Sequence, residues 1–304
     1  MLTRVDVEVG VILGNLARTD PLTYLAALLL YHATFLVRAL RWRKLLENVG
    51  YHRDDGVPLP SVLGIAEIIV LSWFANCIVP AKLGDAYRAY LLKRSAGVSF
   101  SKTFGTILAE RMIDMLMLFA LLAGSVLLAF RGALPPVILG IMEVGLLLVG
   151  VAIVGLVAMR AWHRKIARLV PGRFRDHYRL FTQGTLGSFR SMPLVLTYSL
   201  ASWGIEAGRL YLVCLSLGLT QLSPPIVLFV ALASALLTTL PITPAGLGFV
   251  ESAIVGILLL AAGFGLAPGV DENVATSVAI LDRTISYWSL ILVGFTLYVF
   301  TRKK

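Results

Sequence analysis

The stretch LPITPAGLGFVE, residues 240–251, interrupts one of the most apolar parts of the chain. Its unusual residues are Pro241, Pro244, Gly246, Gly248 and Glu251. Proline removes a backbone donor and clashes with the preceding helical turn, and glycine weakens a helix, so a straight helix is not expected to run through this stretch. We therefore expect two half-helices joined by an irregular turn inside a hydrophobic region.

The composition of the whole chain is that of an integral membrane protein. Of its 304 residues, 58% are hydrophobic and only 14% are charged, and the mean hydropathy is +0.85. Soluble domains contain about a quarter charged residues. Apolar windows recur from end to end, so we expect one integral membrane domain over residues 1–304. The four histidines have no metal-ligand spacing, and we expect no metal and no cofactor.

Apolar runs of about 20 residues predict the membrane helices. They lie at residues 21–46, 101–130, 134–160, 193–217 and 273–300. Two further apolar regions, 61–95 and 222–263, are broken near their middle, the first at Pro80 and Gly84 and the second by the opening stretch. We interpret each broken region as a re-entrant hairpin that enters and leaves on one face of the membrane.

The basic residues agree with this path through the membrane. On the face assigned to the cytoplasm we count 21 of the 27 basic residues, including Arg38, Arg41, Lys82 and Arg88, against three on the other face. Cytoplasmic loops carry such an excess of lysine and arginine. The net charge of +10 therefore indicates membrane topology rather than nucleic-acid binding, and we expect a bacterial or archaeal cytoplasmic (inner) membrane with the C-terminus in the cytoplasm.

The order of elements repeats. Residues 21–130 and 193–300 each read as helix, broken hairpin and helix, and a single membrane helix at 134–160 joins them. The predicted fold class is thus an all-α polytopic membrane protein with two inverted-topology repeats, which is a transporter architecture. The alternative is that any polytopic chain can be divided into halves that look alike.

Segment 161–190 is basic and contains interleaved aromatic residues. We expect it to lie on the inner surface and to contact anionic inner-leaflet lipids. A solvated basic loop without a lipid role is the alternative.

Charged residues inside the predicted helices are the candidate functional residues. Glu110 and Arg111 lie roughly 15 Å into a hydrocarbon layer of about 30 Å, and Asp114 follows on the same helix. Each charge costs about 3 kcal/mol there, so such residues face a polar interior, pair with one another or bind a charged ligand. Glu110 and Asp114 share a helix face. The second half has similar charges in Glu206, Arg209, Asp282 and Arg283.

The broken regions add a reason for a ligand site. Irregular backbone at membrane depth is tolerated where it lines a cavity or is covered by protein. Gly246 and Gly248 permit close approach of a ligand, and a half-helix that starts near them directs its free N–H groups at negative charge. In the first hairpin, Asp85 is expected to cap a half-helix that carries Arg88. Together with Lys82, Arg111 and Arg283, these features suit a phosphate group.

The chain resembles the lysylphosphatidylglycerol synthase transmembrane region family, the flippase-like module of the multiple peptide resistance factor. The resemblance covers residues 21–300 and rests on an ordered set of motifs: RALRW (38–42), Asn76 with PAKLGDAYR (80–88), ERMID (110–114), SWGIE (202–206), LPITPAGLGFVE (240–251) and LDR (281–283). The family usually has arginine and glutamate where this chain has Lys82 and Asp85, and glycine in place of Ala245. We expect a stand-alone member without the aminoacyltransferase domain.

The resemblance implies a protein that moves phospholipids or polyprenyl-linked lipids across the bilayer. We expect a non-enzymatic lipid transporter or flippase that binds an anionic headgroup between the two hairpins. The predicted substrate-binding residues are Asn76, Lys82, Asp85, Arg88, Glu110, Arg111, Asp114, Glu206, Gly246, Gly248, Glu251 and Arg283.

Two alternatives to transport stay open. One is a membrane-embedded lipid-modifying transferase with Asp85, Glu110 or Glu251 as base. The other is a non-transporting accessory protein that recruits a lipid-synthesis enzyme through residues 161–190. A homo-oligomer or such an enzyme is the expected protein partner.

Overall fold

The computed structural model describes residues 8–52, 56–79, 82–129, 135–238 and 243–301, and these ranges contain helices and connecting segments but no strand. Pro80 and Pro241, two of the residues expected to break the hairpins, lie outside the described residues. The all-helical class predicted from the sequence is confirmed.

The first helix of the chain is short. Helix α1 (Val9–Ala17) precedes α2 (Pro21–Asn48), which starts with proline in its first turn. The Asp20 carboxylate caps α2 by accepting a hydrogen bond from the Thr23 backbone N–H at 2.9 Å. Hydrogen bonds from the Thr23 hydroxyl and N–H hold the pKa of Asp20 below its ordinary value. Helix α2 is thus fixed at its N-terminus and continues two residues beyond the predicted end.

Helices α3 (Val62–Ile78) and α4 (Leu83–Ala96) form the first broken hairpin. They approach closely at Gly84, where an added Cβ would lie 2.0 Å from the Ser72 carbonyl oxygen. The Asn76 side chain accepts a hydrogen bond from the Gly84 N–H at 2.8 Å, and the Ser72 hydroxyl donates to the Gly84 carbonyl at 2.8 Å. These contacts hold the two half-helices together directly beside the break.

Three helices follow, and their boundaries differ from the predicted ones. Helix α5 (Phe100–Ala129) matches the prediction, but α6 (Pro136–Leu169) extends nine residues past the predicted end, and α7 (Gly172–Gly187) follows it. Residues 161–169 therefore belong to the long helix α6 rather than to a separate element, and the location of 161–190 on the inner surface stays a prediction. The outward face of α6 is apolar, with Leu147, Val151 and Val154 all more than 60% exposed, as expected for contact with lipid.

Helix α7 packs tightly on α5. A Cβ at Gly184 would lie 2.0 Å from the Lys102 carbonyl oxygen, and a Cβ at Gly105 would lie 2.3 Å from the Phe181 carbonyl oxygen. Small residues at such a crossing let two helix backbones approach closely. The helix is thus docked against the first half, and one of its sides stays exposed with Arg173, Arg175 and Arg179.

The second half repeats the element order of the first. Helix α8 (Met192–Ser216) is followed by α9 (Pro224–Thr238), a single 3₁₀ turn (Pro244–Gly246) and α10 (Phe249–Gly263). Helix α11 (Glu272–Arg283) continues through a π-helical turn (Thr284–Ser289) into α12 (Leu290–Thr301). The last predicted helix is therefore one continuous helix with a π turn directly after Arg283.

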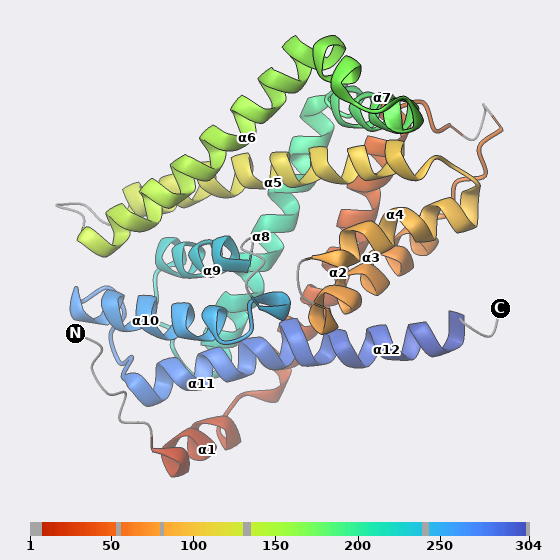
Figure 1. Ribbon diagram of the computed structural model, residues 1–304. Helices are drawn as coiled ribbons and strands as arrows, with labels where there is room; N and C mark the ends of the chain where they lie inside the picture. The colour runs from red at the N-terminus through yellow and green to blue at the C-terminus, as the bar shows by residue number, and fades with distance from the viewer. Residues whose placement is uncertain (1–7, 53–55, 80–81, 130–134, 239–242, 302–304) are drawn as a thin grey trace.

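The two hairpins meet in the middle of the molecule. In Figure 1, α3 and α4 lie on one side of the inclined helix α8 and α9 lies on the other, while α10 crosses the lower part of α8. Helices α2 and α8 run along one another, and α3 contacts the 3₁₀ turn of the other hairpin. The centre of the fold is therefore formed by the two breaks and by α2 and α8.

Within the described ranges, five helical segments are long and apolar enough to cross a membrane. They are Pro21–Asn48, Phe100–Ala129, Pro136–His163, Pro244–Gly263 and Glu272–Thr301. Four coincide with predicted spans and the fifth belongs to the second hairpin, whereas the helix at the predicted span 193–217, α8, is not in this group. Helix α8 falls outside this group because it carries buried polar residues toward the protein interior, among them Ser199, Ser202 and Arg209.

Candidate functional site

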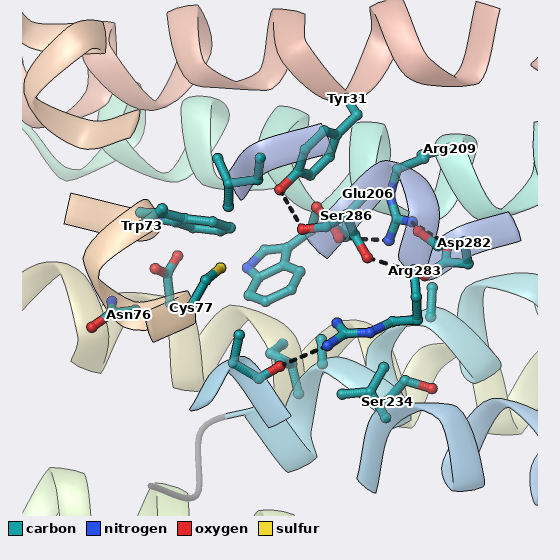
Figure 2. A pocket seen from close by; sticks show the side chains of 18 of the residues that line it. Tyr31, Trp73, Asn76, Cys77, Glu206, Arg209, Ser234, Asp282, Arg283 and Ser286 are labelled. Atoms are coloured by element: carbon teal, nitrogen blue, oxygen red, sulfur yellow. Dashed lines mark hydrogen bonds and ion pairs between the residues drawn. The ribbon is translucent and has the colours of Figure 1, made fainter. Parts of the chain in front are cut away.

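A cavity of about 290 Å³ lies where the broken ends of the hairpins meet, among α2, α5, α8 and α11. Figure 2 shows its wall, with Tyr31, Trp73 and Glu206 on one side and Arg283 reaching across from the other. Its charged lining residues are Arg38, Lys82, Asp85, Arg111, Asp114, Glu206, Arg209, Asp282 and Arg283. Apolar and aromatic side chains such as Met115, Leu118 and Trp203 fill the rest of the wall. The cavity therefore combines charge with apolar surface.

A fully buried ion network lies beneath the wall in the first half. Glu110 of α5 accepts hydrogen bonds from Arg41 of α2 at 3.0 Å and from both terminal nitrogens of Arg88 of α4 at 3.1 and 3.0 Å. Arg41 also binds both carboxylate oxygens of Asp114, at 2.5 and 3.1 Å. Arg88 stacks on the Trp42 ring, 3.8 Å from its centroid. Glu110 and Asp114 face the same way, as predicted, and they share Arg41.

Arg111 lines the cavity and forms ion pairs with two acids of the first half. Its Nε and one terminal nitrogen bind the two oxygens of Asp85, each at 3.1 Å, and its other terminal nitrogen lies 3.6 Å from Asp114. Asp85 is the third residue of α4, and the residue before the helix, Lys82, makes no side-chain cap. The prediction that Asp85 caps this half-helix is therefore wrong, because its carboxylate is directed at Arg111 instead.

The second half has a corresponding set of ion pairs. Arg209 of α8 binds Glu206 at 2.8 Å and also donates to Asp282 of α11. Arg283 binds Glu251 of α10 at 2.9 Å and donates to the Ala245 carbonyl at 3.2 Å. In Figure 2, Arg209, Glu206 and Asp282 form a compact group while Arg283 extends toward the hairpin turn. Both halves therefore use an arginine to tie the start of a half-helix to a long helix.

The turn of the second hairpin is strained at one residue. Ala245 adopts a left-handed conformation with φ of 47°, beside Gly246 at 71° and Gly248 at 87°. The Gly248 N–H donates to the Glu251 carboxylate at 2.7 Å, so the start of α10 is already capped by its own side chain. Neither glycine lines the cavity. The Glu251 carboxylate thus satisfies the N–H of the residue before α10, and the expectation that the first N–H groups of this half-helix are directed at a ligand stays a prediction.

The predicted site residues divide into three groups. The cavity wall contains Asn76, Lys82, Asp85, Arg111, Asp114, Glu206 and Arg283. Arg88 and Glu110 lie behind the wall and form an ion pair. Glu251 also lies outside the wall and binds the wall residue Arg283. Gly246 and Gly248 shape the turn. Arg111 and Arg283, the predicted headgroup ligands, are both engaged by carboxylates, so their charges are balanced within the protein.

Sequence reasoning placed Arg38, Arg41 and Arg88 on the cytoplasmic face, and this is wrong because all three are buried. Lys82 was placed there as well, and it lines the cavity instead. The missed signal was spacing: Arg38 and Arg41 lie three apart on α2, as Glu206 and Arg209 do on α8. Tyr31, Trp73 and Asp282 were also missed as wall residues.

Two wall cations stand apart from the hydrogen-bonded network. Arg38 donates no hydrogen bond to any residue in the described ranges, and its nearest carboxylate oxygen, of Glu206, is 3.8 Å away. Its guanidinium lies over the Trp73 ring, 4.6 Å from the centroid. Lys82 has no ion pair with a described residue within 4.0 Å. Such cations can bind an anion without first losing a partner.

A π-helical turn borders the cavity and links the halves. The Tyr31 hydroxyl of α2 donates to the Ser286 carbonyl at 3.0 Å, and the Tyr287 hydroxyl donates to the Cys77 carbonyl at 3.2 Å. Because π turns free backbone carbonyls from the regular helical pattern, they commonly accept other donors and occur near functional sites. This turn thus anchors α2 and the end of α3 against α11.

The fold and the cavity define a multi-pass helical membrane protein with an internal charged site. The chain belongs to the lysylphosphatidylglycerol synthase TM region family, whose family model matches residues 5–294. It is 35% identical to a UPF0104 membrane protein of Methanocaldococcus jannaschii over 76% of this chain and 95% of that protein. A UPF0104 membrane protein of Pyrococcus horikoshii is 26% identical over 94% of this chain and 89% of its own length.

A third relative is named for an enzymatic activity. Glycosyltransferase AglD of Haloferax volcanii is 28% identical over 91% of this chain, but the match covers 48% of that protein. The family resemblance predicted from the sequence motifs is thus confirmed, and its relatives include archaeal membrane proteins.

Proposed function

We propose that this protein is a lipid transporter of the flippase type, which holds the anionic headgroup of a phospholipid or polyprenyl-linked lipid in the central cavity. The observation that carries the proposal is the cavity itself: about 290 Å³ lined by nine charged residues, in a protein whose outer helices expose apolar side chains. Intramembrane charges cost several kcal/mol each and mark ligand pathways in membrane proteins. The family name, which refers to a lipid-synthase membrane region, supports a lipid substrate.

The ion pairs support two inverted-topology repeats with re-entrant hairpins. An acid followed by an arginine occupies the eleventh and twelfth positions of both α5 and α11, namely Glu110–Arg111 and Asp282–Arg283. In each half the acid binds an arginine of the first helix, and the arginine binds the third residue of the returning half-helix. Repeats of this kind rock around a shared central site in transporters.

We further propose an archaeal or bacterial cytoplasmic membrane with the C-terminus inside. Arg38, Arg41, Lys82 and Arg88 lie in the interior and are no longer counted on the cytoplasmic face. The remaining lysines and arginines are still more numerous on that face than on the other. The exposed arginines of α7, with Phe174 half exposed among them, fit anionic inner-leaflet lipids.

A second candidate is suggested by the relative named glycosyltransferase AglD. In that case the membrane module would accept or present a lipid for a transferase rather than move it. Turnover of a sugar nucleotide by the purified protein, in the presence of a lipid acceptor, would favour this candidate over transport.

The transport proposal is tested in vesicles that contain the purified protein and a trace of lipid with a fluorescent headgroup. We expect the protein to accelerate movement of the label between leaflets, and Arg283→Gln to slow it. Arg43→Gln is the matched control, because Arg43 is a partly exposed arginine of α2 that pairs with Glu47 outside the cavity. Label movement equal to that in protein-free vesicles would contradict the proposal.

A further inference from the structure

Among the arginines of the cavity wall and of the ion network beneath it, one is set apart from the others. Arg41, Arg88, Arg111, Arg209 and Arg283 each donate at least one hydrogen bond to a carboxylate. Arg38 donates none to a described residue, although its side chain is only 5% exposed. A buried guanidinium without a hydrogen-bonded acceptor is costly, so this position requires a partner that the described residues do not supply.

Complementary groups surround Arg38. The Glu206 Oε2 atom, 3.8 Å from an Arg38 terminal nitrogen, is buried and accepts no hydrogen bond within the described residues. The buried Trp203 Nε1–H, on the same helix, has no acceptor among those residues either. Arg38, Trp203 and Glu206 all line the cavity. The site thus offers two donors beside one unused acceptor.

The gap between Arg38 and Glu206 also lies between the two halves. Every other ion pair between described cavity-wall and network residues lies within one half, whereas this one joins α2 to α8. At 3.8 Å the two groups are too far apart for a hydrogen bond, so a ligand that enters between them breaks none. The least constrained ionic contact of the network is therefore at the boundary between the halves.

We propose, building on the lipid-transport function above, that Arg38 and Glu206 form a subsite for a headgroup whose phosphate lies next to a hydroxyl or ammonium group. Arginine binds the phosphate oxygens, for which its planar guanidinium is well suited. Glu206 Oε2 accepts a hydrogen bond from the neighbouring hydroxyl or ammonium. Lys82 supplies a second positive charge on the same cavity wall. A phosphate that lacks a neighbouring donor fills only the Arg38 part of this subsite.

The test compares a lipid that carries a donor beside its phosphate with one that carries none. Dihexanoyl phosphatidylglycerol carries hydroxyl groups beside its phosphate, whereas dihexanoyl phosphatidylmethanol carries the same phosphate and no donor. Binding of each to the purified full chain in maltoside micelles is measured by titration calorimetry, with glycerol phosphate and inorganic phosphate as probes without acyl chains.

We expect the glycerol lipid to bind at least about tenfold more tightly than the methyl lipid, as for one hydrogen bond to a charged group. Glu206→Ala should remove this preference, and Glu206→Gln, which keeps an acceptor oxygen, should retain part of it. Arg38→Gln and the charge-conserving Arg38→Lys should weaken both lipids about tenfold or more, whereas Arg43→Gln should leave both unchanged.

Equal binding of the two lipids by the wild-type protein would overturn the inference, and so would a preference that survives Glu206→Ala. If glycerol phosphate binds as tightly as the glycerol lipid, the subsite serves a free anion and the lipid inference is wrong. Failure of the inference is distinguishable from failure of the transport proposal, because leaflet exchange of labelled lipid in vesicles is measured separately.

Discussion

Removal of the Glu110 carboxylate gives the sharpest test of the buried ion network. Glu110 accepts three hydrogen bonds from two arginines whose side chains are at most 1% exposed. In Glu110→Met, Arg88 loses the one carboxylate that it binds among the described residues, whereas Arg41 keeps Asp114. Breaking a buried ion pair by removing one partner costs about 3–5 kcal/mol, and we expect a loss of this size in the free energy of unfolding.

Two further variants establish the cause of the loss. Arg88→Met/Glu110→Met removes both charges of the pair, and we expect it to be more stable than Glu110→Met alone, because no uncompensated buried charge is left. Asp114→Asn should cost less than Glu110→Met, since Arg41 keeps Glu110 and Arg111 keeps Asp85.

Unfolding is followed by helical circular dichroism during titration of the protein with sodium dodecyl sulfate in mixed micelles. The predicted order of stability is wild type, then Asp114→Asn, with Glu110→Met the lowest and the double variant above it. A Glu110→Met protein as stable as wild type, or a double variant less stable than Glu110→Met, would refute the view that these charges are compensated inside the protein.

Three other substitutions test the close contacts, each by the unfolding midpoint in the same titration. Gly84→Ala should destabilise the first hairpin by more than about 2 kcal/mol, because its Cβ would lie 2.0 Å from a backbone oxygen, and a neutral result would contradict the packing. Gly184→Ala should similarly weaken the contact of α7 with α5, whereas Gly172→Ala on the same helix meets open space and serves as control. Ala245→Gly should be tolerated. Ala245→Val should lower the free energy of unfolding by about 1 kcal/mol or more, since branched residues are disfavoured at a φ of 47°. Equal stability of these two variants would show that the turn is unstrained.

The helix order and the two broken hairpins could be predicted from the sequence because they depend on local features. Apolar windows locate helices, and proline and glycine locate breaks. The shared face of Glu110 and Asp114 follows from helical periodicity alone. These predictions required no knowledge of which helices are neighbours.

The roles of the arginines could not be predicted because they depend on distant partners. Arg41 binds Glu110 and Asp114, which lie 69 and 73 residues further along the chain. Near the end of α2, Arg38 and Arg41 are followed by Arg43 and Lys44, so the whole run looks like a cytoplasmic flank. Only the neighbouring helices determine which of these side chains are turned inward.

The sequence did not single out Arg38, the cavity-wall cation that donates no hydrogen bond to a described residue. Sequence reasoning chose Arg111 and Arg283 as headgroup ligands because they lie in the middle of helices. Their balancing acids, Asp85 and Glu251, lie 26 and 32 residues away on the returning half-helices. A sequence shows which charged residues lie within membrane helices. The ion pairs between distant residues determine which of these charges can still bind a ligand.

The central claim is that a lipid headgroup passes through the cavity between the two hairpins, and filling this cavity tests it most directly. Met115 of α5 lines the cavity, and Leu127 of the same helix is 76% exposed on the outer surface. The measurement is the rate of leaflet exchange of a headgroup-labelled lipid in vesicles containing Met115→Trp or Leu127→Trp. We predict that Met115→Trp reduces exchange to the level of protein-free vesicles while Leu127→Trp matches wild type; equal, wild-type exchange by both variants would contradict the claim.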